Sequence, residues 1–421
     1  MSEQHEKIVI TGIGAISSLG ATARATFEGL VAGRSGIRDV PWAVPEGMEV
    51  RIGAFIDQYE RPALGNFDYT NPGPGRYSEM ALLATREALA DSGLASDQDR
   101  AKAGYESHRI ATILGVGLGN GEAIVGASAK IVAGRLDEIS STWGDRMAPH
   151  LATELLAAEA GATGPSCCVQ SACASAAHSI GYGFDLLRSG IVDVAVVGGA
   201  EAPIAPFGLS LFERIGALSK YVGPAQRASR PFDRERSGFV MGEGAGMLIL
   251  ETLSHARRRG ARIYAELAGY GATADAFHVT RPSADGRGMS NAIKRALHVA
   301  GIDPESVDYV NAHGTGTEFN DAAETNALKQ TFGDHARKLW ISSNKSMFGH
   351  LLGAAAAVET VATVCTLASG TVPPTLNLDN PDPECDLDYV PHEARKKPVR
   401  VAIKNSFGFG GQNASLVLRT I

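Results

Sequence analysis

The segment Gln170-Ser171-Ala172-Cys173-Ala174-Ser175-Ala176-Ala177 decides the fold, because a β-branched, cysteine-containing run gives way here to small helix-forming residues. This boundary predicts a strand at residues 165–170 that leads into a buried helix ending near residues 188–190. The thiol of Cys173 then lies on the first turn of that helix. Aligned peptide dipoles at a helix start stabilise a thiolate. We therefore expect Cys173 to be a nucleophile at neutral pH.

Two histidines far downstream have similarly unusual surroundings. His313 follows a predicted strand and precedes Gly314-Thr315-Gly316-Thr317, which offers hydroxyl groups and open backbone. Ligands collect at the carboxyl ends of strands in α/β sheets. His350 follows a glycine and opens a predicted helix. A helix start disfavours the imidazolium form, so this ring should stay neutral and donate from one nitrogen.

Lys345 lies between an apolar strand and an alanine-rich helix, five residues before His350. A buried lysine needs a carboxylate, and the candidates are Asp321, Glu324 and Glu359. One cysteine, two histidines and a lysine suffice for acyl transfer to sulfur followed by carbon–carbon bond formation.

A last unusual segment is Gly408-Phe409-Gly410-Gly411. A backbone N–H there could join the Cys173 N–H as an oxyanion hole. The alternative interpretation is a β-turn before the final strand.

Strand-like and helix-like segments alternate along the whole chain. The predicted strands cover residues 7–14, 110–116, 165–170, 192–197, 245–251, 263–271, 307–311, 339–343, 399–404 and 414–419, and the predicted helices include 77–92, 290–300 and 353–367. Such alternation predicts an α/β protein with a mainly parallel sheet covered on both faces. The pattern occurs twice around a polar break at residues 256–262. We therefore predict two halves, 1–262 with the cysteine and 263–421 with both histidines and the lysine.

Composition excludes several classes of protein. The 421 residues are 44% hydrophobic and 20% charged with a net charge of −7, which is ordinary globular composition with no extended basic surface for nucleic acid. Five cysteines without C-x-x-C spacing argue against a zinc site or a disulfide framework and for a reducing compartment. The other four, Cys167, Cys168, Cys365 and Cys385, are typical of small buried hydrophobes or of structural loop residues.

The sequence also shows no pattern typical of a targeting signal. Residues 1–7 are polar and run straight into a strand, without the apolar core of a signal peptide. The longest apolar helical stretch, 351–368, contains Glu359, so we expect a buried helix and not a membrane span. These features predict a cytoplasmic protein.

Two glycine patterns suggest a dinucleotide site. They are Gly12-x-Gly14 and Gly115-x-Gly117-x-Gly119, and neither completes G-x-G-x-x-G. A nucleotide-binding oxidoreductase is therefore the weakest of the functions considered.

The segments around Cys173, His313, Lys345 and His350, with Asn405-Ser406-Phe407-Gly408-Phe409-Gly410-Gly411, resemble the β-ketoacyl-acyl-carrier-protein synthases of the elongating, two-histidine type. The resemblance covers essentially the whole chain, including Ser229-Arg230-Pro231-Phe232-Asp233, Gly238-Phe239-Val240-Met241-Gly242-Glu243-Gly244-Ala245, Val372-Pro373-Pro374-Thr375 and Leu378-Asp379-Asn380-Pro381. It separates the chain from thiolases, which use a second cysteine, and from initiating synthases, which use Cys-His-Asn.

The resemblance implies a fold and a reaction. The fold is the thiolase fold, two similar halves in a five-layered αβαβα arrangement, usually as a homodimer. Cys173 would accept an acyl chain from an acyl carrier protein. His313 and His350 would hold the malonyl thioester carbonyl and stabilise the enolate formed on loss of carbon dioxide. No metal or organic cofactor is implied, because the thioester is the electron sink.

It also implies supporting roles. The N–H groups of Cys173 and Phe409 would form the oxyanion hole, and Phe409 would gate the acyl channel. Lys345 would order the histidines within a network of Asp321, Glu324 and Glu359. The remaining roles fall to Thr315 and Thr317 on the pantetheine arm, Leu118 in the acyl pocket wall and Asp275 on a second mobile loop.

The chain departs from the family pattern where an acidic carrier protein usually docks. Basic residues are usual there, whereas this chain has Leu136-Asp137-Glu138 and Gly75-Arg76-Tyr77-Ser78-Glu79, and it has Phe348 in place of a usual threonine. The other basic residues available are Arg214, Arg227 and residues 257–259. Our hypothesis is a dedicated carrier protein in a polyketide or polyene pathway.

Two quaternary arrangements follow from the resemblance. A non-catalytic chain-length subunit would look similar but lack the nucleophile, so the presence of Cys173 with both histidines argues against it. A heterodimer in which this chain is the active member stays open beside the homodimer.

Overall fold

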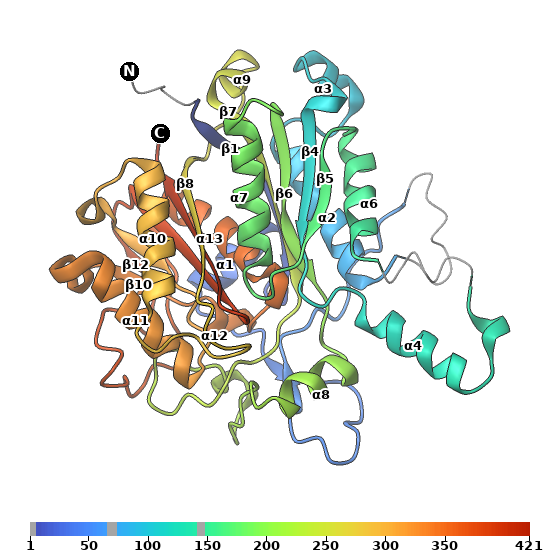
Figure 1. Cartoon of the computed structure of the whole chain (residues 1–421), viewed down its shortest axis with the longest axis vertical. Helices are drawn as coiled ribbons and strands as arrows, with labels where there is room; N and C mark the ends of the chain where they lie inside the picture. Colours follow the sequence, from blue (N-terminus) through green and yellow to red (C-terminus); the bar gives the residue numbers. More distant parts are fainter. Residues whose placement is uncertain (1–5, 65–73, 141–147) are drawn as a thin grey trace.

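A computed structural model describes residues 6–64, 74–140 and 148–421 (Figure 1). Its main sheet has ten strands: β1 (Ile8–Ser17), β4 (Ile110–Gly115), β5 (Ser166–Val169), β6 (Val194–Glu201), β7 (Gly244–Thr252), β8 (Ala265–Ala274), β9 (Tyr309–Asn311), β10 (Trp340–Ser342), β13 (Val401–Gly408) and β14 (Gln412–Arg419). Two small two-stranded sheets pair β2 (Arg38–Asp39) with β3 (Ile52–Gly53) and β11 (Thr371–Val372) with β12 (Arg395–Lys396). The predicted strands are all present.

The α-helices connect these strands. They are α1 (Ala23–Val31), α2 (Arg76–Asp91), α3 (Asp97–Lys102), α4 (Gly121–Val132), α6 (His150–Ala160), α7 (Ser175–Arg188), α8 (Pro206–Arg214), α9 (Leu253–Arg258), α10 (Arg287–Ala300), α11 (Glu318–Phe332), α12 (Lys345–Phe348) and α13 (Ala355–Ser369). The residues 1–5, on which part of the signal-peptide argument rests, lie outside the described ranges.

The strand order repeats itself in the two halves of the sheet. The order is β10-β9-β13-β14-β8-β1-β7-β6-β4-β5. Numbered along the chain within each half, both β5-β4-β6-β7-β1 and β10-β9-β13-β14-β8 read third, second, fourth, fifth, first. The halves join through a short antiparallel contact of β1 with β8. The duplication was only weakly indicated by the sequence, because the two halves share no obvious identity.

The prediction of a mainly parallel sheet is wrong. Five of the nine neighbouring pairs are antiparallel and four are parallel. The last strand of each half, β7 or β14, runs antiparallel to both of its neighbours. In the second half only residues 409–411 separate β13 from β14, and a connection that short can form only an antiparallel pair.

The helices and the two halves of the sheet together form the predicted five layers. Helices α2 and α6 pack on the outer face of the first half, and α10 with α11 covers the second half. Between the two halves lie α7 and α13, which contact each other and both parts of the sheet (Figure 1). The α/β, αβαβα prediction is therefore confirmed.

Glycines explain the close approach of sheet and outer helices. A side chain at Gly14 would meet the backbone oxygen of Ala84 in α2 at 2.0 Å, and one at Gly271 would meet that of Ala292 in α10 at 2.2 Å. Gly14 in the first half and Gly271 in the second thus let an outer helix pack closely on the sheet at equivalent places. Close helix packing accounts for the Gly12-x-Gly14 fragment, and no dinucleotide site is needed to explain it.

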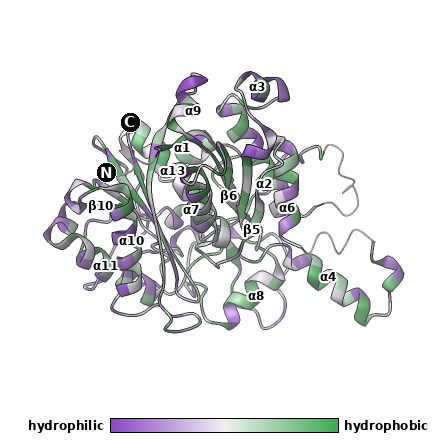
Figure 2. Cartoon of the chain, turned by 45° about the horizontal axis from the view of Figure 1, so that its top comes forward, coloured by the Kyte–Doolittle hydropathy of each residue, from purple (hydrophilic) through white to green (hydrophobic). Residues whose placement is uncertain are grey.

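The central helix α13 is a core element. Residues 352–369 have the length and apolar composition of a membrane span, but 83% of this window is buried inside the protein. Hydrophobic residues mark the central strands and helices, and hydrophilic residues mark outer elements such as α3 and α9 (Figure 2). The expected buried helix is confirmed, and it supplies Glu359 to the middle of the molecule.

Candidate active site

The backbone around Cys173 makes a sharp turn between β5 and α7. Ala172 has φ = 50°, in the left-handed region that non-glycine residues rarely adopt. The turn is held by Ser175, whose hydroxyl accepts a hydrogen bond from the Ser171 N–H (2.9 Å) and donates to the Ala172 carbonyl (2.6 Å). Ser406 of β13 donates to the Cys173 carbonyl at 2.8 Å. Both halves of the molecule therefore fix the direction of the thiol.

The surroundings of Cys173 oppose the thiolate that the sequence predicts at neutral pH. Cys173 lies two residues before α7 begins and is only 6% exposed. Burial raises its pKa to about 11, although Lys345 and the N–H groups of Phe409 and Cys173 itself lower it. Desolvation of the anion outweighs the helix dipole. Cys173 therefore rests as a thiol beside groups that stabilise its anion.

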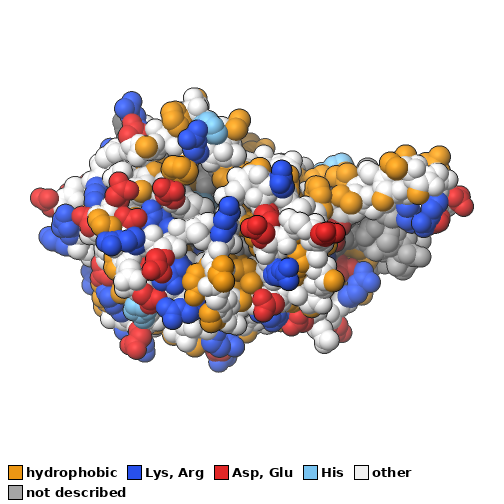
Figure 3. All heavy atoms as spheres, turned by 90° about the horizontal axis from the view of Figure 1, so that it is seen from below, with side chains coloured by type: hydrophobic (Ala, Val, Ile, Leu, Met, Phe, Trp, Pro, Cys, Tyr) orange, Lys and Arg blue, Asp and Glu red, His pale blue; other side chains and the backbone are white. Residues whose placement is uncertain are grey.

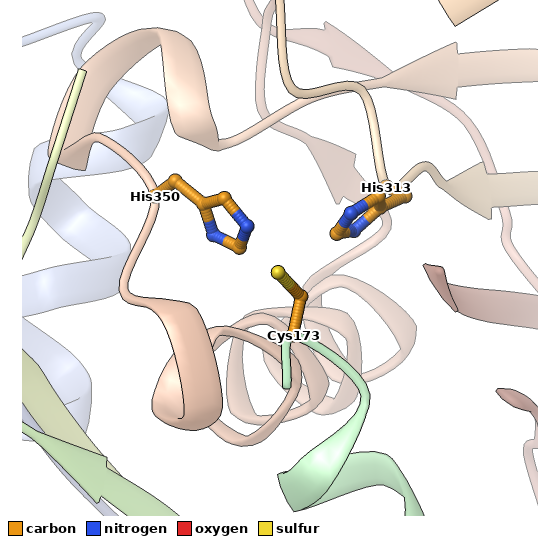
Figure 4. A group of neighbouring side chains, drawn as sticks. All are labelled: Cys173, His313 and His350. Carbon is orange, nitrogen blue, oxygen red and sulfur yellow. The ribbon is translucent and has the colours of Figure 1, made fainter. Parts of the chain in front are cut away.

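Both histidine rings point at this sulfur (Figure 4). The sulfur and one ring nitrogen from each of His313 and His350 all lie within 4.8 Å of one another. The rings are nearly perpendicular, with centroids 5.3 Å apart. Three residues separated by up to 177 positions in the chain (350 − 173) thus meet in one buried cluster.

His350 is held as a neutral donor. The Leu352 N–H donates to its Nδ1 at 3.2 Å, so the proton of the neutral ring lies on Nε2. That Nε2 is buried and has no hydrogen-bond partner among the described residues. The pKa values of His350 and His313 are both well below the usual range, because burial and the nearby Lys345 disfavour imidazolium. Neutrality was predicted for His350, but its cause is burial and not a helix start.

His313 is positioned through its backbone. Its N–H and that of Gly314 both donate to the Glu324 carboxylate, at 2.9 and 2.8 Å. Its Nδ1 is buried without a hydrogen-bond partner in the described structure. The two rings thus offer polar nitrogens that nothing else within the described residues satisfies, and such buried groups are candidates for substrate contact.

Lys345 finds one of its three candidate carboxylates. Its Nζ lies 2.5 Å from Glu359 Oε1, with both groups buried. Glu324 instead binds the His313 backbone. Asp321 accepts hydrogen bonds from the Phe232 and Gly316 N–H groups and lies 3.9 Å from Arg236, so its place in the Lys345 network is a wrong prediction.

Sequence reasoning missed two buried charges. Lys404 lies 2.9 Å from the second oxygen of Glu359 and is fully buried. The sequence feature that could have revealed Lys404 is a lysine directly after the apolar run Val401-Ala402-Ile403. Glu201, at the end of β6, accepts hydrogen bonds from the N–H groups of four residues, at 2.6–3.1 Å, namely Gly117, Leu118, Gly119 and Gly353.

The cluster opens into a pocket of about 350 Å³. Cys173, His313, His350, Asp275 and Phe409 line it, together with Thr315 and Thr317, whose hydroxyl oxygens are 2.8 Å apart. Asp275 accepts a hydrogen bond from Asn413 at 2.6 Å, and its N–H donates to the Gly411 carbonyl. It thus ties its own loop to the segment that contains Phe409.

Leu118 does not line this pocket. It lies in a neighbouring apolar cluster with Leu209, Phe212 and Leu352, against which Phe409 packs. Phe409 contacts both the pocket and this apolar cluster, and its ring centroid lies 6.5 Å from that of Phe212. The predicted acyl-wall residue therefore lies in an apolar cluster that adjoins the pocket and shares Phe409 with it.

A cysteine thiol that faces two neutral imidazoles, in a duplicated five-layered fold, defines a condensing enzyme of the thiolase fold. Comparison with known proteins agrees. The N-terminal domain of beta-ketoacyl synthases matches residues 5–256, and the C-terminal domain matches residues 264–379.

Relatives and solved structures match along their whole lengths. The chain is 40% identical to the 3-oxoacyl-[acyl-carrier-protein] synthase 2 of Synechocystis sp. over 99% of this chain and 98% of the relative. A type II polyketide synthase acyl-carrier protein in complex with its ketosynthase aligns at 33% identity and a TM-score of 0.91, over 99% of this chain and 100% of the other. The ishigamide ketosynthase/chain length factor aligns at 35% identity and a TM-score of 0.89, over 99% of this chain and 100% of the other. The chain belongs to the beta-ketoacyl synthase family, a family of carbon–carbon bond-forming acyltransferases.

Proposed function

We propose that this protein is a 3-oxoacyl-[acyl-carrier-protein] synthase, which extends an acyl chain by two carbons through decarboxylative condensation with a malonyl thioester. The observation that supports it most is the convergence of the Cys173 sulfur with one ring nitrogen from each of two buried, neutral imidazoles. A sulfur nucleophile and two neutral donors are what acyl transfer and enolate stabilisation require.

The first step is acyl transfer. The Cys173 sulfur attacks the thioester carbon of an acyl carrier protein, while the N–H groups of Cys173 and Phe409 hold the developing oxyanion. The tetrahedral intermediate expels the phosphopantetheine thiolate, which takes up the proton lost by Cys173. The products are acyl-Cys173 and the free carrier thiol, and no other reactant is needed.

The second step forms the carbon–carbon bond. His313 and His350 donate hydrogen bonds to the malonyl thioester oxygen. The bond to the carboxylate carbon breaks, carbon dioxide leaves, and the electron pair of that bond stays on the remaining thioester as an enolate. The enolate carbon attacks the acyl-Cys173 carbonyl and expels the cysteine thiolate, which takes up a proton from solvent. Two neutral donors stabilise the enolate without protonating its carbon, and one such donor contributes about 10²–10³ in rate.

The remaining pocket residues have supporting roles in this proposal. Thr315 and Thr317 bind the pantetheine arm through their hydroxyl groups. Phe409 swings between the sulfur and the apolar cluster that contains Leu118, and so controls access to an acyl channel. Asp275 holds the Phe409 segment through Asn413.

The carrier protein docks at the pocket mouth. Arg281 lines the pocket beside Phe319, and Arg214 ends α8 next to the pocket residue Ile215. Two of the other basic residues considered are already paired. Arg227 forms an ion pair with Asp379, and Arg259 forms a largely buried one with Glu251. Exposed cations beside apolar side chains suit an acidic carrier protein.

A second chain completes the assembly. Helix α4 projects from the body and exposes apolar side chains, with Val132 88% and Ile131 55% exposed (Figures 1 and 3). Strand β5 ends the sheet in the described part of the chain. A second copy covers both surfaces in a homodimer. The alternative is a heterodimer in a type II polyketide or polyene system, and the solved complex of the ketosynthase ApeO with its chain length factor ApeC shows a ketosynthase paired with such a factor.

The boundary between the halves falls near residue 262, supported by the repeated strand order. We place the enzyme in the cytoplasm, where malonyl carriers would be available and five unpaired cysteines stay reduced.

The test is a complete reaction. The purified protein is mixed with acyl and malonyl carrier proteins, and the carrier is weighed intact. A 3-oxoacyl product two carbons longer than the acyl donor, absent with Cys173→Ala, supports the proposal. Activity with a fatty-acid carrier protein argues for chain elongation in fatty-acid synthesis, and activity only with a dedicated carrier argues for the polyketide alternative. No product with any carrier argues against the function.

A further inference from the structure

Lys404 is a second buried lysine beside the active site, and the proposed mechanism leaves it without a role. It lies on β13 with no exposed surface. Its Nζ lies 2.9 Å from Glu359 Oε2 and donates to the Asn405 carbonyl. A fully buried ammonium is costly, so its presence here calls for a function or for strong pairing.

The lysine completes a chain of charges that reaches both histidines. Glu359 lies between two ammonium groups, with Lys345 at 2.5 Å on one oxygen and Lys404 at 2.9 Å on the other. Asn405 follows Lys404 and donates from Nδ2 to Glu324 at 3.3 Å. Glu324 in turn holds the His313 N–H. One end of the chain is thus Lys345, near both rings, and the other is the His313 backbone.

We infer that Lys404 is a positioning residue for the condensation reaction, a fixed cation that clamps Glu359 and keeps His313 and His350 neutral. This inference rests on the proposed function, because it assigns the histidines as neutral donors. Lys404 touches no substrate and acts through Glu359 and through its field.

The electrostatic balance explains why one lysine is not enough. The titratable groups that face this region are Lys345 on α12, Glu359 on α13, Glu324 on α11, Tyr309 on β9, Cys173, and the rings of His313 and His350. Without Lys404, one ammonium would face two buried carboxylates. The excess negative charge would favour imidazolium and weaken the donors. Lys345 and Lys404 both lower the pKa values of the two histidines.

The charge of Lys404 is itself titratable. Burial lowers its pKa to about 8, and Glu359 opposes that shift. Its cation is therefore present below about pH 8 and lost above it. Above that pH the two histidines are neutral with or without the cation, so its loss acts by weakening their N–H donors, and decarboxylation should decline on the alkaline side as Lys404 is deprotonated.

The experiment compares pH profiles of carbon dioxide release from malonyl carrier protein. It uses the full-length enzyme, Lys404→Met, which keeps the bulk and removes the charge, and Lys404→Arg, which keeps the charge at every pH tested. Lys396→Met, at an exposed lysine on β12, is the matched control. Thermal unfolding of each variant checks the fold.

Three results are expected. In Lys404→Met, kcat falls about tenfold with little change in KM, and the alkaline limb near pH 8 disappears. Its acid limb moves up by roughly half to one pH unit, because the histidines are protonated more easily. In Lys404→Arg, the acid limb of the pH profile stays in place and the alkaline limb moves to higher pH. A folded Lys404→Met enzyme with both limbs unchanged overturns the inference.

Three further outcomes keep the test decisive. If Lys404→Met does not fold, Lys404→Ala is measured with and without methylammonium. Rescue of the rate supports the inference, and a folded variant without rescue contradicts it. A wild-type profile without an alkaline limb near pH 8 also contradicts it. A wild-type enzyme that releases no carbon dioxide refutes the proposed function instead.

Discussion

At the scale of single residues, the site is built on imidazoles that donate without titrating. Burial and neighbouring lysines keep His313 and His350 neutral, and the Leu352 N–H fixes the donor nitrogen of His350. A neutral donor stabilises an enolate oxygen and does not transfer a proton to the carbon, so decarboxylation can lead to condensation.

Replacing either histidine should separate the two half-reactions. We expect His313→Ala and His350→Ala each to lower decarboxylation about 10²–10³-fold, while acyl transfer to Cys173 falls much less. Carbon dioxide release and enzyme acylation are measured separately. His298→Ala, at an exposed histidine of α10, is the control and should behave as wild type. Equal loss of both half-reactions in the active-site variants would contradict these roles.

The raised pKa of Cys173 makes a second prediction at this scale. Because only the thiolate is alkylated, the rate of Cys173 modification by iodoacetamide should rise about tenfold per pH unit below its pKa of about 11. Peptide mass spectrometry follows this site separately from the other four cysteines. A rate that is already constant from neutral pH upward would mean a preformed thiolate.

At the scale of elements, Glu201 shows how loops from different parts of the chain are fixed together. From the end of β6, it holds the segment 117–119 after β4 and Gly353 after His350. Burial raises its pKa to about 7, and the four N–H donors oppose that shift. Leu118 and His350 are thus both positioned by loops that one carboxylate joins.

The substitution Glu201→Gln tests this connection. The amide would place N–H donors against backbone N–H donors, so we expect a loss of about 1–3 kcal/mol in the free energy of unfolding. Condensation should also slow, because the segment after His350 loses its anchor. Urea unfolding and product formation are compared with Glu305→Gln, at an exposed glutamate. A variant as stable as wild type would contradict the role.

The same scale shows what the sequence could predict. Strand and helix positions follow from hydrophobic periodicity and turn residues, and they agree with the structure to within a few residues. Cys173, the histidines and Lys345 were found because each breaks the pattern of its own segment. Glu201 and Lys404 were missed because their partners are distant in sequence and each directly follows an ordinary run of strand residues. The antiparallel pairs were missed because periodicity does not report strand direction.

At the scale of the whole molecule, the duplicated fold brings chemistry from its two halves together. The first half supplies Cys173 and the second supplies His313, Lys345 and His350, and α7 and α13 pack between them. The exposed apolar arm of α4 extends beyond this body and needs a covering surface.

We expect α4 to form part of a homodimer interface. The double substitution Ile131→Asp with Val132→Asp would bury two charges in that interface and should yield a monomer by light scattering after size exclusion. Val222→Asp, at a 95% exposed residue outside α4, is the control and should remain a dimer. A wild-type monomer, or a dimer that survives the double substitution, would contradict the homodimer and favour a different partner.

The most direct test of the whole account is the mass of the intact protein after incubation with an acyl carrier protein. We predict a single acyl adduct on the wild type and none on Cys173→Ala, which retains four other cysteines. An adduct that persists on Cys173→Ala, or no adduct from any acyl donor, would contradict the assignment of Cys173 as the nucleophile.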